Sequence, residues 1–167
     1  MRFDKQFIEV IGVLGVIASL TFVGMQLLLD RQVALADQYF NRTESRLATT
    51  RSQLESEDYI DLLVAQWENG RRPTFLSEEL ELLIPEGYSP RNIMTQVLDF
   101  QLNALAWENL YFQYQQDMIP EDLWSNSRKN LKDQIQEPIR LAAYRRFSNN
   151  AEFYDLLDRL QQESRSN

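Results

Sequence analysis

The sequence predicts an all-α protein, in which an N-terminal transmembrane helix continues into a long helix and is followed by a compact multi-helix bundle. Three observations support this prediction. Residues 10–29 contain no charged residue and no proline, apolar residues elsewhere recur at helical 3–4 spacing, and no stretch alternates with period two for long. From residue 31 onward there are 19 leucines against nine valines and isoleucines, which favours helices over strands.

The first element is the apolar run, which we expect to span a membrane over about residues 8–29. At a rise of about 1.5 Å per residue, 20 helical residues cover roughly 30 Å, the thickness of a bilayer's hydrocarbon core. Residues 1–30 are therefore a predicted anchor in contact with membrane lipid. The residues assigned to the span are Ile8, Val10, Ile11, Gly12, Gly15, Ser19, Phe22, Gln26 and Leu29.

A cleaved signal peptide is the alternative interpretation of this run. Two basic residues precede it, and residues 34–36 read Ala-Leu-Ala, so a secreted helical domain released after Ala36 fits the pattern. However, the apolar run is longer than the ~7–15 residues of a signal peptide core, and the cleavage pattern follows the charged pair Asp30–Arg31. We therefore favour an uncleaved anchor.

The basic residues on either side of the run bear on its orientation. Arg2 and Lys5 precede it, whereas Arg31, Arg42 and Arg46 follow it. Because cytoplasmic flanks are enriched in lysine and arginine, this small excess favours a single span in the cell inner membrane with the helical domain in the cytoplasm.

Residues 31–56 are expected to extend the same helix as a juxtamembrane segment, because they contain neither proline nor glycine. Apolar residues recur there every seven positions, which is typical of a coiled-coil-like stripe. The candidate interaction seam consists of Val33, Ala36, Phe40, Leu47 and Leu54.

The same register, traced back into the span, reaches Gly15 and Gly12, and small residues allow helices to approach closely in lipid. Two interpretations of the stripe from Gly12 to Leu54 stand at this point. It either joins the chain to a second copy or a membrane-protein partner, or packs on the chain's own later helices.

Residues 57–167 are expected to form the helical domain. Ser77, and Ser89 followed by Pro90, are typical helix starts, and Gly70 is a typical helix end. The helix from Pro90 to about residue 115 is apolar over much of its circumference, so we place it at the centre of the domain. Further helices are expected over about 58–69 and 77–83, after residues 120 and 138, and around 153–160.

Composition excludes several kinds of chemistry. The chain has no cysteine and no histidine, which removes thiol nucleophiles, Ser-His-Asp triads and His-bearing metal sites. Residues 31–167 carry a net charge of −7, which disfavours nucleic-acid binding. The carboxylate pairs Asp58/Asp61 and Asp155/Asp158 lack the glycine-rich loop of a metal or phosphate site. We predict no catalytic residue, cofactor or metal, and no small-molecule ligand is evident.

Glu108 and Asn109 stand out because they interrupt the most apolar helix of the domain. A partly buried carboxylate with a raised pKa is the usual mark of a functional acid, so a membrane-bound enzyme using Glu108 is a further alternative. The competing interpretation is that both residues lie on the one exposed edge of that helix, or that Glu108 pairs with an arginine. We favour the competing interpretation.

Three short stretches resemble a known family. They are Phe22–Leu27 at the membrane exit, Trp107–Tyr114 in the central helix and Pro120–Trp124 at a helix start. Together they are similar to a family of small, uncharacterised bacterial proteins with one N-terminal transmembrane helix and an all-helical domain. This resemblance implies the architecture only, since the family has no activity to transfer. The function predicted from the sequence is therefore non-enzymatic protein–protein interaction or regulation at the membrane.

Overall fold

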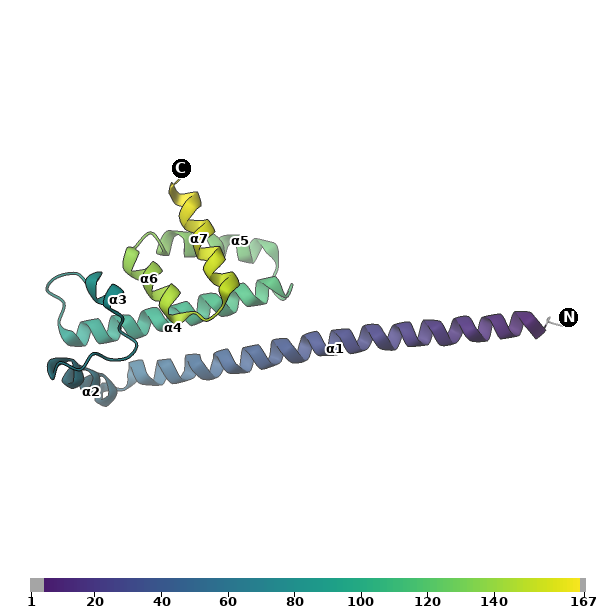
Figure 1. The fold of residues 1–167 in the computed structure, drawn as a ribbon, viewed down its shortest axis with the longest axis horizontal. Helices are drawn as coiled ribbons and strands as arrows, with labels where there is room; N and C mark the ends of the chain where they lie inside the picture. Colours follow the sequence, from purple (N-terminus) through teal and green to yellow (C-terminus); the bar gives the residue numbers. More distant parts are fainter. Residues whose placement is uncertain (1–4, 166–167) are drawn as a thin grey trace. The chain divides into compact units, whose positions relative to one another are not determined.

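The computed structural model describes the backbone of residues 5–165 and the side chains from Glu9 to Arg165. Every regular element in that range is a helix, which confirms the predicted all-α class. The helices are α1 (Lys5–Glu55), α2 (Glu57–Glu68), α3 (Glu78–Leu82), α4 (Pro90–Gln115), α5 (Glu121–Gln134), α6 (Pro138–Phe147) and α7 (Ala151–Arg165) (Figure 1).

The chain divides into two units, Met1–Phe40 and Asn41–Asn167, and the division lies within α1. The first unit is the N-terminal part of this helix. The second contains the last part of α1 together with α2 to α7, which form the predicted bundle. Helix α1 runs without interruption through residue 30, where the sequence places the end of the anchor, because no glycine or proline follows that point until after the helix has ended.

Helix starts in the bundle follow the local sequence. Ser77 caps α3 by accepting the backbone N–H of Leu80 at 3.3 Å, and Ser89 caps α4 by accepting that of Asn92 at 3.2 Å. Pro90 takes the first helical position of α4, where its missing N–H has no cost. These predicted starts are confirmed.

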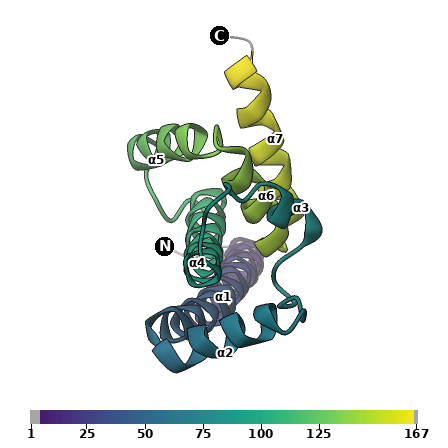
Figure 2. The same cartoon turned by 90° about the vertical axis from the view of Figure 1, so that its left-hand side faces the viewer.

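Helix α4 is the centre of the bundle, as predicted. It lies between α2 on one side and α5, α6 and α7 on the other (Figures 1 and 2), and its most extensive helix contacts are with α6 and α2. It also contributes more buried residues than any other helix. Its buried apolar residues are Ile93, Met94, Val97, Leu98, Phe100, Ala104, Leu105 and Tyr111.

Candidate membrane-spanning helix and buried polar site

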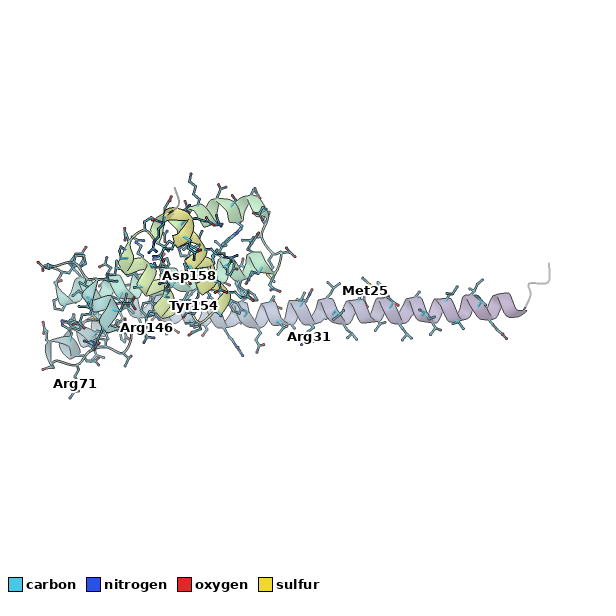
Figure 3. All side chains as sticks on the ribbon, turned by 45° about the horizontal axis from the view of Figure 1, so that its top comes forward. Met25, Arg31, Arg71, Arg146, Tyr154 and Asp158 are labelled. Carbon is cyan, nitrogen blue, oxygen red and sulfur yellow. The ribbon has the colours of Figure 1, made fainter. Side chains whose placement is uncertain are left out.

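The N-terminal part of α1 is the first candidate functional feature. Among the described residues, this is the one helix that is long and apolar enough to cross a bilayer, and none of its apolar window is buried. Figure 3 shows side chains, with Met25 and Arg31 labelled, projecting from the ribbon of this helix. The described apolar side chains before residue 30 therefore have no cover within the described chain.

The residues predicted to span the membrane lie along this exposed stretch. Those with described side chains are all exposed: Val10, Ile11, Gly12, Gly15, Ser19, Phe22, Gln26 and Leu29. Ile8 lies in α1, but its side chain is outside the described residues.

Two hydroxyl groups in the apolar stretch have partners inside the helix. Ser19 Oγ donates to the carbonyl of Gly15 at 2.8 Å, and Thr21 Oγ1 donates to that of Ile17 at 2.9 Å. A hydroxyl that is bonded to its own helix needs no water, so both residues are compatible with an apolar environment.

The structure places the five residues of the candidate interaction seam in different environments. Val33 and Phe40 are 58% and 47% exposed, whereas Ala36 is buried. Leu47 and Leu54 are half-buried, and Leu54 packs against the bundle core. The five residues therefore do not share one covered face, and their role as a seam stays a prediction.

Glu108 and Asn109 form a buried polar site in α4, with exposed fractions of 5% and 8%. The expectation that they occupy an exposed edge of the helix is wrong, because the bundle covers this face as well. The Glu108 carboxylate accepts the backbone N–H of Asn149 at 3.2 Å, and Asn109 Oδ1 has no hydrogen-bond partner among the described residues. Glu108 thus binds α4 to the connection between α6 and α7.

That connection, residues 148–150, has several further hydrogen bonds. Asn150 starts α7 by accepting the N–H groups of Glu152 and Phe153, and the Tyr154 hydroxyl donates to the carbonyl of Ser148 at 2.7 Å. Arg46 of α1 also reaches this connection and donates to the carbonyl of Phe147, the last residue of α6, at 3.3 Å. A positive charge is favourable there because the C-terminal end of a helix carries a partial negative charge. We call residues 147–150 the α6–α7 corner.

Sequence reasoning missed this corner. One local signal was available, since asparagine is a favoured helix N-cap and Asn150 precedes an amphipathic segment. The contacts from Arg46 and Glu108 had no sequence signal, because both residues lie far from the corner along the chain.

A second polar group lies between α4, α5 and α6, where Tyr144 is buried and Trp107 and Gln134 are half-buried. Gln134 Oε1 accepts both the indole N–H of Trp107 at 3.0 Å and the hydroxyl of Tyr144 at 2.6 Å. Burial raises the pKa of Tyr144 above its usual value of 10.0, and Arg140 opposes part of that rise. The Gln134 side chain thus provides a hydrogen-bond acceptor for both the Trp107 indole and the Tyr144 hydroxyl.

The described residues contain no group of three or more acidic side chains placed to hold a metal ion. Within the two carboxylate pairs singled out in the sequence, Asp61 pairs with Arg91 and Asp158 pairs with Arg145. Asp61 and Asp158 are therefore ordinary surface residues that form ion pairs with arginine.

Comparisons with known proteins give no relative for the chain. No family model, no curated protein and no solved structure matches it. The resemblance to a family of small bacterial membrane proteins therefore stays a prediction from the sequence.

Proposed function

We propose that the chain is a single-pass membrane protein whose helical bundle binds or regulates another protein at the membrane. The observation that carries the proposal is the uncovered apolar part of α1, which is long enough to cross a bilayer. A water-exposed helix of this composition is strongly unfavourable, because burying apolar surface yields about 25 cal/mol for each Å². Lipid supplies the missing cover along about residues 8–29.

The non-enzymatic part of the proposal rests on chemistry. The chain lacks histidine and cysteine, and the sharpest candidate acid, Glu108, is buried and engaged with the backbone of the α6–α7 corner. A reacting carboxylate needs access to a substrate. We therefore assign Glu108 a structural role and place the function of the bundle in protein contacts.

A paired topology reporter tests anchoring and orientation. One reporter enzyme active only in the cytoplasm and one active only outside it are each fused after Asn167. Because more basic residues follow the span than precede it, we expect activity from the cytoplasmic reporter alone. Activity from the external reporter reverses the orientation, and an intact mass that begins after Ala36 replaces anchoring by secretion.

A photo-crosslinker tests the protein-contact part. It replaces Phe40, which is exposed on α1, and in a matched control it replaces Tyr88, which is 43% exposed in the bundle. We expect Phe40 to yield products with a second copy of the chain or with a membrane-protein partner, at higher yield than Tyr88. Intramolecular products alone would contradict an interaction seam at this position.

A further inference from the structure

The bundle contains a groove that the proposed function does not use. Its volume is about 420 Å³, and its walls come from α3, the turn between α5 and α6, α6 and α7. Figures 1 and 2 show α3, α6 and α7 on the same side of α4. The volume lies within the range of about 300–1,000 Å³ that is typical of small-molecule sites.

The lining of the groove has an apolar part. It consists of Leu83, which directly follows α3, Ile135 from the α5–α6 turn, and Pro138, Leu141 and Ala142 from α6. Ile135, Leu141 and Ala142 also belong to the bundle core, so packing holds them in place. This surface suits an aliphatic group of a ligand.

Several polar residues of the groove are already engaged. Arg145 pairs with Asp158, and the Gln136 amide donates to Ser164 Oγ at 2.8 Å and to the carbonyl of Lys132 at 2.8 Å. The side chains of Arg145 and Gln136 are therefore held in place by other residues of the bundle.

Two lining residues of opposite charge are not engaged. Among the described residues, neither Arg165 of α7 nor Glu79 of α3 forms an ion pair or a side-chain hydrogen bond, and they do not contact each other. The side-chain amide of Gln161, also in the lining, forms no hydrogen bond within the described part of the chain. The groove therefore offers one cation and one anion, on different helices, beside an apolar surface.

We propose that this groove binds a free amino acid with an apolar side chain. The guanidinium of Arg165 matches the α-carboxylate, because its planar donors fit a carboxylate in two-point contact. Glu79 matches the α-ammonium group, and the apolar lining receives the side chain. A ligand with only one of these charges leaves the other residue of the groove unpaired. The inference goes beyond the proposed function and does not depend on membrane anchoring.

Ligand-observed NMR on the full chain in lipid nanodiscs tests this site, with empty nanodiscs as the blank. The probe is L-leucine, and each analogue removes one group: leucinamide lacks the carboxylate, 4-methylpentanoate lacks the ammonium group, and glycine lacks the side chain. We expect each analogue to bind about tenfold more weakly than leucine, since each loses one charged or apolar contact. Equal binding of 4-methylpentanoate and leucine overturns the proposal.

Variants locate the site. Arg165→Gln should weaken leucine binding about tenfold, whereas Glu79→Gln should make leucine and 4-methylpentanoate bind alike, because the partner of the ammonium group is gone. Arg71→Gln and Glu86→Gln make the same charge changes at exposed loop residues outside the groove and should leave binding unchanged.

Two further results overturn the inference. One is the absence of leucine binding up to about 10 mM, a concentration at which even a weak specific site is occupied. The other is unchanged binding in Arg165→Gln, provided that circular dichroism shows the variant to be folded. The outcome of the topology reporter does not change either of these leucine-binding measurements. Failure of the amino-acid-binding proposal can therefore be distinguished from failure of the membrane-anchoring proposal.

Discussion

Helix α4 and the N-terminal part of α1 are both rich in apolar residues, but their side chains meet different surroundings. Phe100 in α4 is 1% exposed, whereas Phe22 in α1 is 61% exposed. The apolar faces of α4 are covered by other helices of the bundle, and the apolar residues of α1 before residue 30 have no cover from the described chain. The comparison teaches that a high apolar content does not by itself make a helix part of a protein core.

The largest expected effect comes from the same substitution in both regions. Phe100→Ala should lower the free energy of unfolding of the bundle by about 3–5 kcal/mol, because it leaves a cavity in a packed core. Phe22→Ala should change it by less than about 0.5 kcal/mol, since the ring has no contacts in the bundle to lose. Tryptophan fluorescence during chemical denaturation measures both, as the three tryptophans lie at 67, 107 and 124. A loss above about 1 kcal/mol for Phe22→Ala would contradict the contrast.

The next effect concerns insertion into the membrane. Leu20→Arg places a charge near the middle of the apolar run, which costs about 2.5–3.5 kcal/mol in translocon-mediated insertion. We expect this variant to leave the membrane fraction after carbonate extraction. Leu82→Arg is the control, because Leu82 is 85% exposed in the bundle and its substitution should not alter fractionation. Retention of Leu20→Arg in the membrane would count against the span.

A smaller effect is expected at the buried polar site of α4. Glu108→Ala removes the acceptor of the Asn149 N–H and should destabilise the bundle by about 1–3 kcal/mol. Glu108→Gln retains a side-chain carbonyl at this position and should cost less than half as much. The same denaturation assay measures both variants. If the glutamine variant folds normally but a cellular phenotype is lost, the enzymatic alternative gains support over our structural assignment.

The smallest effect is expected at Tyr144. Tyr144→Phe removes a hydrogen bond to Gln134 and should cost about 1 kcal/mol at pH 7. Because burial raises the pKa of Tyr144 in the folded state, the neutral hydroxyl stabilises the fold below pH 10.0, and this contribution is lost as pH rises through the raised pKa. Wild-type stability should therefore fall more steeply above pH 10.0 than that of Tyr144→Phe. Parallel curves in this range would refute the assignment.

The sequence by itself determined the all-α class, the unbroken first helix and the main helix starts. Ser77, Ser89 and Pro90 act on backbone groups within a few residues, so their effect is local and can be recognised without the fold. The central place of α4 was also predictable, because a helix that is apolar on most sides requires neighbours on most sides.

Only the tertiary structure decided how the polar residues are used. Glu108 and Asn149 are far apart in the sequence, and the packing of α4 with α6 brings the carboxylate to the α6–α7 corner. In the same way, Arg165 and Glu79 line one groove because α3 and α7 are placed around it by the bundle. Contacts of this kind depend on how helices pack, and helical periodicity specifies which face of a helix is apolar without specifying which helix covers it.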